Sequence, residues 1–244
     1  MSIRKIFLEG RLMIEKIKHE IEGLGALDII RYIEQQFGNT AVFSTSFGIE
    51  DQVVTHLLAE AKSEASIFTL ETGRLFPETY YVWNRTLEKY KLPIKAYYPN
   101  TEAVENLLTT KGPSSFYESV DNRKECCYIR KIEPLHRAIN GFKVWITGIR
   151  AEQSANREGM SAVEWDAANN IIKIHPIFDW TLADVEAFLK SNSIPYNPLH
   201  DKGFPSIGCQ PCTRAVQPGE DFRAGRWWWE DTSKKECGLH ITTK

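Results

Sequence analysis

Residues 41–61 read AVFSTSFGIEDQVVTHLLAEA, an apolar run, a small polar loop and a longer helix-like segment in direct succession. The apolar run 41–43 is typical of a buried strand, and the segment 49–61 has the length of a helix. The loop 44–48 lies between them. The stretch therefore predicts a strand, a loop and a helix, which is the repeating unit of parallel α/β sheets.

The same alternation continues along the chain. Strand-like runs at 66–70, 94–98 and 143–149 alternate with helix-like segments at 76–90, 101–108 and 126–139, and Pro77 suits a first helical turn. Before them, a stripe of apolar residues over the first forty residues predicts a helical lead-in, formed by Leu27, Ile30, Ile33 and Phe37. We therefore expect an α/β fold, a three-layer sandwich with a mainly parallel sheet.

The later part of the chain changes character. Short strands are expected at 162–166 and 171–174, and Thr181 and Asp184 form a capping-box pattern that opens a helix at 182–191. After Ser191 proline and glycine are frequent and no long periodic segment follows. We expect an α/β domain over residues 1–205 and a loop-rich C-terminal segment over residues 206–244.

Composition excludes some classes of protein. The 244 residues are 42% hydrophobic and 25% charged, as in ordinary soluble domains, and 30 basic against 32 acidic residues give a net charge of -2. This balance argues against a nucleic-acid-binding surface, so an anion site must be local. No signal-peptide core and no run of about 18 apolar residues is present. We expect a cytoplasmic protein that does not bind membranes; the oligomeric state, a homo-oligomer included, stays open.

The five cysteines are unevenly spaced. They form an adjacent pair (Cys126, Cys127), a C-x-x-C pattern (Cys209, Cys212) and one residue near the end, Cys237. In a reducing compartment such residues are more often metal ligands or nucleophiles than disulfide partners. Four thiolates can bind either one zinc ion or a 4Fe-4S cube.

The adjacent pair favours the cube. Neighbouring side chains on a helix point about 100° apart, which suits separate irons better than a single zinc ion. The competing interpretation makes Cys126 and Cys127 small core residues and leaves only Cys209 and Cys212 functional. The basic residues around the pair weaken that interpretation, because they would stabilise thiolates and attract an anion: Arg123, Lys124, Arg130 and Lys131.

Two loops at strand ends are candidate ligand sites. The loop Ser44 to Gly48 precedes a helix, where backbone N–H groups and the helix dipole favour an anion. The stretch Glu71 to Arg74 follows the next strand, at the edge where open α/β sheets bind ligands. Either stretch could also be an ordinary turn.

The C-terminal segment carries further candidates. Cys237 has no visible packing role, and His240 and nearby lysines would lower its pKa, although a harmless surface cysteine is the alternative. Arg223 and Arg226 are spaced so that one helical turn would direct both at a single oxyanion. A solvated charged face is the alternative for them, and core packing is favoured over base stacking for residues 227–229.

Six motifs together resemble assimilatory adenylyl-sulfate (APS) reductases of the iron-sulfur bacterial type, within the phosphoadenylyl-sulfate (PAPS) reductase family. They run in the family's order and cover most of the chain: STSFGIED (44–51), LETGRLFPETY (70–80), KECCYIRK (124–131), ITGIRAEQS (146–154), GCQPCTRAV (208–216) and ECGLH (236–240). The double cysteine, the GC-x-PCTRA motif and the ECGLH motif are the most specific.

The resemblance implies an adenine nucleotide α-hydrolase-like fold and thiol-dependent reduction of APS to sulfite and AMP. It implies one 4Fe-4S cluster, bound by Cys126, Cys127, Cys209 and Cys212. Cys237 would be the nucleophile that forms an S-sulfocysteine, and thioredoxin or a similar thiol reductant would then release sulfite. The cluster would have a structural and electrostatic role, placing Lys131 next to the substrate.

The resemblance also implies roles for other residues. Positive charge at the reacting sulfate would come from Lys131, Arg223, Arg226 and His240. Arg150 and Arg157 would add to it, although Ala151 stands where the family usually has a second basic residue. The adenosine and its phosphate would contact Ser44, Ser46, Phe47, Gly48, Glu50, Thr72, Gly73 and Arg74.

Three other functions compete with this one. A PAPS reductase, or an enzyme that accepts both nucleotides, would share the loops and the tail but ordinarily lacks the four cluster cysteines. A nucleotide-binding module stapled by zinc would need the cysteines and leave Cys237 incidental. An ATP pyrophosphatase would carry a loop nearer to S-G-G-x-D-S than the SFGIED found here.

Overall fold

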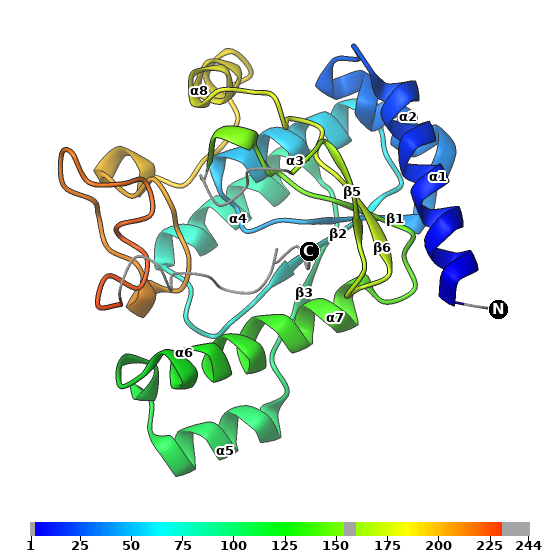
Figure 1. Ribbon diagram of the computed structural model, residues 1–244. Coiled ribbons are helices and arrows are strands. Elements are labelled where there is room, and N and C mark those ends of the chain that lie inside the picture. The colour runs from blue at the N-terminus through cyan, green and yellow to red at the C-terminus, as the bar shows by residue number, and fades with distance from the viewer. Residues whose placement is uncertain (1–2, 154–159, 231–244) are drawn as a thin grey trace.

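The computed structural model describes residues 3–153 and 160–230, and within them a six-stranded sheet forms the centre of the molecule. The strand order is β3-β2-β1-β4-β6-β5. The strands are β1 (Ala41–Ser44), β2 (Ser66–Leu70), β3 (Ile94–Tyr97), β4 (Val144–Ile146), β5 (Val163–Asp166) and β6 (Ile171–Ile174). Figure 1 shows the sheet passing through the middle of the fold.

All neighbouring strands are parallel except β5, which pairs antiparallel with β6 at one edge. The central strands β1, β4 and β6 are almost entirely buried, since their apolar side chains face helices on both sides. The adjacent pair Asn169–Asn170 turns the chain between β5 and β6, and Asn170 adopts the left-handed conformation that such tight turns need. The prediction of a mainly parallel sheet is confirmed.

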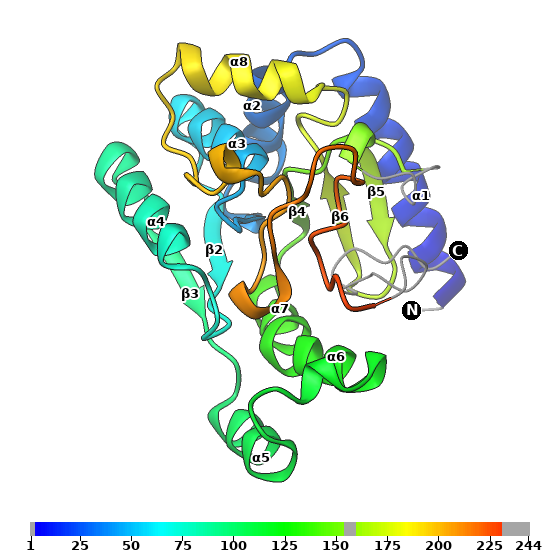
Figure 2. The ribbon, with the colours of Figure 1, turned by 90° about the vertical axis from the view of Figure 1, so that its left-hand side faces the viewer.

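Helices cover both faces of the sheet. The helices are α1 (Ile3–Ile21), α2 (Ala26–Phe37), α3 (Ile49–Ala61), α4 (Pro77–Tyr90), α5 (Thr101–Lys111), α6 (Val120–Cys127), α7 (Glu133–Ile139) and α8 (Leu182–Ser191). Side chains of α1, α2, α3 and α8 share one core with one face of the sheet. Residues of α7 share a second core with the other face (Figure 2). The three-layer sandwich is therefore confirmed.

The local rules read from the sequence hold at two helix starts. Pro77 is in the first turn of α4, where its missing N–H costs no hydrogen bond. Thr181 and Asp184 form the expected capping box at the start of α8.

One expected helix is wrong in detail. The sequence predicts a single helix over 126–139, but α6 already begins at Val120, where the Ser119 side chain accepts a bond from the Asn122 N–H. A π-helical turn, Tyr128–Ile132, follows Cys127 and leads into α7. Pi-helical turns are often found at functional sites, and this one carries Lys131. The stretch 223–226, expected as a helical turn, forms hydrogen-bonded turns instead.

The strand order reverses direction next to β1. From β1 the chain moves outward to β2 and β3, then returns to place β4 on the opposite side of β1. Open α/β sheets bind ligands at such a switch point, beyond the carboxyl ends of the strands. The fold therefore directs attention to the loops that follow β1 and β4.

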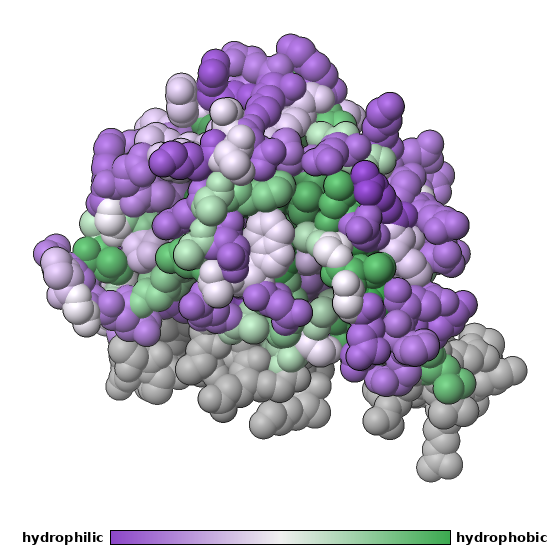
Figure 3. Space-filling view, turned by 90° about the horizontal axis from the view of Figure 1, so that it is seen from above, coloured by the Kyte–Doolittle hydropathy of each residue, from purple (hydrophilic) through white to green (hydrophobic). Residues whose placement is uncertain are grey.

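One face of the molecule is mostly hydrophilic (Figure 3). Seen from above, hydrophilic residues cover most of the visible face, and a band of apolar residues crosses its middle (Figure 3). Among the helices of the described residues, none combines the length and the apolar character that crossing a membrane requires.

Candidate functional site

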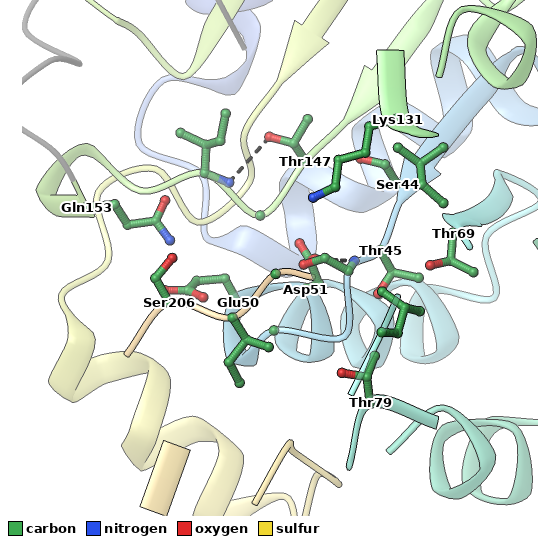
Figure 4. Close-up of a pocket in the computed structure, with 18 of the residues that line it drawn as sticks. Ser44, Thr45, Glu50, Asp51, Thr69, Thr79, Lys131, Thr147, Gln153 and Ser206 are labelled. Carbon is green, nitrogen blue, oxygen red and sulfur yellow. Dashed lines mark hydrogen bonds between the residues drawn. The ribbon is translucent and has the colours of Figure 1, made fainter. Parts of the chain in front are cut away.

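A cavity of about 250 Å³ opens at the carboxyl ends of β1, β2 and β4. Its walls come from the loops after these strands, from the π-helical turn and from the segment 205–208. Figure 4 shows Lys131 and Ser44 on one side of it and Glu50, Gln153 and Ser206 on the other. The polar residues of the wall include Ser44, Thr45, Ser46, Glu50, Asp51, Thr69, Thr72, Thr79, Lys131, Thr147, Gln153, His200, Ser206 and Arg223.

A carboxyl group joins the two loops at the switch point. The Ser46 backbone N–H and hydroxyl both donate to Asp51 Oδ2, at 2.6 and 2.7 Å. Gly148, in the loop after β4, lies so close that an added Cβ would be 2.6 Å from Asp51 Oδ1. Burial raises the pKa of Asp51 to about 6, although hydrogen bonds from Ser46 and Gly148 act in the opposite direction. The carboxyl group thus holds the β1 and β4 loops together.

A buried ion pair fixes the start of α3. The Arg150 guanidinium donates to Glu50 Oε1 through Nε and Nη2, at 3.1 and 2.9 Å. Its third nitrogen donates to Glu152 and to the Trp180 carbonyl. Only 1% of Arg150 is exposed, and it is not among the residues of the cavity wall. Arg150 therefore holds Glu50 in place at the wall.

Two cations of the described residues reach the cavity. Lys131 extends from the π-helical turn, and Figure 4 shows its amine directed between Thr147 and Asp51. Arg223 comes from the C-terminal segment. With the N-terminus of α3 at the same cavity, the wall combines positive charge and hydrogen-bond donors, which suits an anionic ligand.

A second, smaller pocket lies next to the first. Cys126 and Cys127 line it from the end of α6, and Cys209 and Cys212 line it from the C-terminal segment. Each cysteine is at most 9% exposed, and the four pack with Leu107, Phe116 and Trp227 in one buried cluster. The two cysteine pairs, far apart in sequence, are thus together in the fold, as the sequence led us to expect. Lys131 lines both pockets.

Positive charge surrounds the four thiols. Arg74, Arg123, Arg130 and Lys131 complete the wall of the small pocket. Arg123 pairs with Glu230 at 2.8 Å in a buried ion pair, and Arg130 donates to the Thr72 carbonyl at 2.6 Å. Arg226 is 7% exposed and lies over the Trp227 ring, in a space that a Cβ on Gly208 would fill.

Burial favours the neutral form of the Cys126 and Cys212 thiols, because it raises the pKa of each. Burial raises the pKa of Cys126 against the opposing effect of Arg74 and Arg130. Burial also raises the pKa of Cys212 to about 12; Cys209 adds to this increase and Lys131 and Arg226 reduce it. A metal centre bound here would therefore have to displace protons.

The chemistry of this pocket fits a sulfur-ligated cluster. Three buried N–H groups of its surroundings have no hydrogen-bond partner in the described structure: Arg130 Nε, Trp227 Nε1 and Trp229 Nε1. Unsatisfied buried donors are rare and call for an acceptor that is part of the complete site. Four thiolates and inorganic sulfides would supply such acceptors and would balance the surrounding cations.

A single metal ion fits less well. Within residues 3–153 and 160–230, no group of three or more His, Cys, Asp or Glu side chains could hold a metal ion. One zinc ion would need four sulfurs at about 2.3 Å from it. A cube binds each sulfur at a separate iron and so tolerates wider spacing.

The structure separates the predicted ligand contacts into two groups. Ser44, Ser46, Gly48, Glu50 and Thr72 line the large cavity with Lys131 and Arg223. Phe47, Gly73, Arg74, Arg150 and Arg226 do not: Phe47 is buried against Trp83, and Arg74 lines the cysteine pocket. Arg157, Cys237 and His240 lie outside the described residues.

Several residues of the cavity were missed in the sequence. Trp145, Thr147 and Gly148 follow or end β4, and His200 lies in a short turn of the loop-rich segment. The first three could have been found, because the strand-like run 143–149 was recognised and its carboxyl end must lie beside that of β1. Nothing in the local sequence marks His200.

Known proteins place the chain in a family. A family model described as the phosphoadenosine phosphosulfate reductase domain matches residues 40–215. The adenosine 5'-phosphosulfate reductase of Burkholderia cepacia is 50% identical over 201 residues, which cover 82% of this chain and 80% of that protein. The corresponding protein of Allochromatium vinosum is 48% identical over 202 residues, covering 83% and 79%.

Solved structures agree with this relationship. The crystal structure of a phosphoadenylyl-sulfate reductase from Candida auris, a phosphate complex, has a TM-score of 0.72 at 27% identity and covers 83% of this chain and 96% of that one. An FMN adenylyltransferase from Candida glabrata, with a TM-score of 0.54 at 17% identity and coverage of 86% and 76%, shares the fold alone. The chain belongs to the phosphoadenosine phosphosulfate reductase family.

Proposed function

We propose that this protein reduces adenosine 5'-phosphosulfate to sulfite and AMP, with electrons from a thiol reductant. The observation that carries the proposal is the position of Lys131, which lines both the polar cavity and the pocket of four cysteines. The names of relatives near 50% identity support APS as the substrate. Such an enzyme would act in assimilatory sulfate reduction in the cytoplasm.

The cavity would bind the nucleotide. The N-terminus of α3 and the loop Ser44 to Gly48 would face the phosphate, where N–H groups and hydroxyls favour negative charge. Lys131 and Arg223 would face the sulfate group, because two anionic groups joined as an anhydride need cations on both sides. Glu50 and Thr72 line the remaining wall and would contact the nucleoside.

Cys237 would be the nucleophile. Its thiolate attacks the sulfur atom of the sulfate group, a sulfur–sulfur bond forms, and the bond from that sulfur to the bridging oxygen breaks, so that AMP leaves. Cys237 then carries a sulfonate. A thiolate of the reductant attacks the Cys237 sulfur, sulfite departs with the bonding electron pair, and the second thiol of the reductant restores the Cys237 thiol while a disulfide forms in the reductant.

Cations limit the barrier of the first step. A thiolate that approaches a sulfate group brings two negative charges together, and the transition state gathers them at one place. This role is supported by the fact that Lys131 and Arg223 both line the cavity. His240 and Arg226 are proposed to add to it by analogy with the family, and Arg157 and Arg150 with them, although Arg150 is engaged with Glu50.

Cys126, Cys127, Cys209 and Cys212 would hold a 4Fe-4S cluster. When bound, it would supply a fixed charge and a covalent tie between α6 and the C-terminal segment, while the dithiol supplies both electrons. The chain's own part is to hold Lys131 at the cavity, through the same π-helical turn that follows Cys127.

The direct test compares substrates with anaerobically purified protein and reduced thioredoxin. Sulfite and AMP should form from APS with kcat/KM at least about tenfold higher than from PAPS, a difference of about 1.4 kcal/mol in transition-state binding. A strong advantage for PAPS would instead support the second candidate function, a PAPS reductase, which the family model and the Candida auris structure favour.

Metal analysis separates the enzyme from a zinc-stapled binding module. Iron with acid-labile sulfide and a brown colour is expected. Colourless protein with one zinc ion per chain would remove the cluster from the proposal.

A further inference from the structure

A row of polar side chains crosses the sheet on the face covered by α7 and ends at the cavity. Trp145 of β4 and Lys173 of β6 are register partners, so their side chains lie next to each other on the same face. Asp166 of β5 flanks Lys173 on one side, and Ser44 at the end of β1 lies beyond Trp145. Four strands thus contribute one residue each to a continuous chain of contacts.

The outer half of this row is a buried ion pair. Lys173 Nζ lies 2.6 Å from Asp166 Oδ2, and the two side chains are 3% and 5% exposed. Asn169 adds two hydrogen bonds to the same carboxylate, at 3.1 and 2.8 Å. Burial acts to raise the pKa of Asp166, but the bonds from Lys173 and Asn169 outweigh it and lower that pKa. The Asp166 carboxylate is therefore ionised and faces the Lys173 amine in the ion pair.

The inner half connects this charge to the cavity. Lys173 Nζ lies 4.8 Å from the centre of a Trp145 ring, an arrangement in which a cation is attracted to the π-face. Trp145 Nε1 donates to Ser44 Oγ at 2.8 Å. Both Ser44 and Trp145 line the cavity.

The direction of the Trp145 bond decides what Ser44 can do. An indole N–H is a donor only, so Ser44 Oγ must accept from it and is left with its own hydrogen to donate. In the part of the chain that the structure describes, no other bond of the Ser44 side chain is present. The serine is therefore a hydrogen-bond donor toward the cavity, with its oxygen held at a fixed position.

Packing alone does not explain this arrangement. A phenylalanine at position 145 would give the core an aromatic ring without a polar atom. An apolar residue at position 173 would avoid the cost of burying an ammonium group, which can exceed what a buried ion pair returns. Both the ion pair and the indole N–H are explained if they orient the Ser44 hydroxyl for binding a ligand.

We propose that Trp145 and Lys173 are positioning residues that hold the Ser44 hydroxyl as a donor to the phosphate group of the bound nucleotide. Lys173 fixes the Trp145 ring, Trp145 fixes the serine oxygen, and Ser44 is the residue of the row that donates to the phosphate. The inference rests on the proposed function insofar as the ligand is a nucleotide 5'-phosphate.

The test measures binding of AMP and of adenosine by calorimetry, with purified holoprotein. Trp145→Phe removes the N–H and keeps an aromatic ring, and Ser44→Ala removes the donor. Each should raise the Kd for AMP by about 5- to 10-fold, the effect of one hydrogen bond, and leave the Kd for adenosine unchanged. The double variant should bind AMP no more weakly than Ser44→Ala alone, because both changes remove the same interaction.

Lys173 is tested in the same assay. Lys173→Met should raise the Kd for AMP about threefold, and Lys173→Arg, which keeps the charge over the ring, should restore it. If Lys173→Met does not fold because Asp166 loses its partner, the double change Lys173→Met with Asp166→Asn is used and should give the same threefold effect.

Several results would overturn the inference. These are an unchanged AMP affinity in Trp145→Phe, an equal loss of adenosine affinity, additive effects of the Trp145 and Ser44 changes, or wild-type protein that does not bind AMP. The proposed function fails separately. Wild-type protein that makes no sulfite from APS, yet shows the coupled loss of AMP binding, would leave the inference standing.

Discussion

The cavity at the strand ends and the pocket of cysteines lie side by side but differ in how complete they are. The two carboxyl groups of the cavity wall both have partners: Asp51 accepts hydrogen bonds from Ser46, and Glu50 pairs with the buried Arg150 behind the wall. In the cysteine pocket burial raises the pKa of the Cys126 and Cys212 thiols, and N–H groups of Arg130, Trp227 and Trp229 lack acceptors in the described structure. The carboxyl groups of the first region are paired within the fold, whereas the second has buried donors that the proposed cluster would supply with acceptors.

Two residues connect the regions. Lys131 lines both pockets. Thr72 lines the cavity, accepts a bond from the Cys209 thiol at 3.4 Å through its hydroxyl, and accepts one from Arg130 through its carbonyl. A substitution in the cysteine pocket should therefore change ligand binding or activity in the cavity. A substitution in the cavity should leave the iron content of the cysteine pocket unchanged.

The largest effect is expected from breaking the incomplete region. Cys212→Ser should lose iron and sulfide and lower the rate of sulfite formation by at least about 100-fold, because the group that joins α6 to the C-terminal segment and holds Lys131 is gone. Iron analysis and activity measure this. Trp228→Phe, a change of an exposed neighbour, is the control. Full activity without iron would show that the cavity works alone.

The next effect concerns the residue shared by both regions. Lys131→Ala should reduce kcat/KM for APS by about 100-fold, as when one donor to a developing negative charge is removed, while the iron content stays unchanged. Steady-state kinetics and the visible spectrum measure the two regions separately. Lys124→Ala, a change of an exposed lysine in the preceding helix α6, should have no effect. If Lys131→Ala kept both the cluster and full activity, Lys131 would not connect the function of the two regions.

The buried Asp51 carboxyl group of the cavity predicts that the free energy of unfolding depends on pH. The pKa of Asp51 is raised in the fold, so the folded protein binds a proton more readily than the unfolded chain, and the free energy of unfolding should fall as the pH rises from about 4 to 6. The whole change is about 3 kcal/mol for a shift from 3.8 to about 6.

Urea unfolding of wild type and Asp51→Asn at several pH values isolates this contribution. The variant should lack this pH dependence of the free energy of unfolding. If the wild type lacks it too, Asp51 is less buried than the structure describes. A bound phosphate should also compete with ionised Asp51 for Ser46, so AMP affinity should weaken above pH 6 in the wild type only.

The smallest effect comes from the close contact between the β1 and β4 loops. Gly148→Ala would place a methyl group 2.6 Å from Asp51 Oδ1 and 3.1 Å from the backbone of α3, so the free energy of unfolding should fall by about 1 to 3 kcal/mol. AMP affinity should fall with it, and the iron content should not change. Gly25→Ala, which meets no atom within 4 Å, is the matched control. Loss of iron in Gly148→Ala would contradict the one-way dependence of the two regions.

The sequence predicts the fold well because the evidence for it is local. Alternation of strand-like and helix-like segments, Pro77 and the Thr181 capping box all act within a few residues, and each is found as expected. The π-helical turn at Tyr128–Ile132 was not predictable, because its residues have the spacing of an ordinary helix and the tertiary contacts of Arg130 and Lys131 decide its form.

The site was predictable only in part, for a similar reason. Spacing identifies Cys209 and Cys212, and the strand-loop-helix pattern identifies Ser44 to Gly48. Arg150 and Phe47 belong to the same motifs, yet Arg150 turns inward to Glu50 and Phe47 packs on Trp83. A motif places a backbone segment at the site, but the packing around it decides which side chains reach the ligand. Trp145 and Lys173 show the converse, since only the register of β4 and β6 reveals their connection to Ser44.

The central claim is that two regions cooperate to let one thiol attack an anionic sulfate group. It is tested most directly by mass spectrometry of the holoprotein after incubation with APS and without any reductant. The account predicts one sulfonate group on the peptide that contains Cys237, formed together with one equivalent of AMP and removed when reduced thioredoxin is added. An intact cluster with no adduct on Cys237 would contradict it.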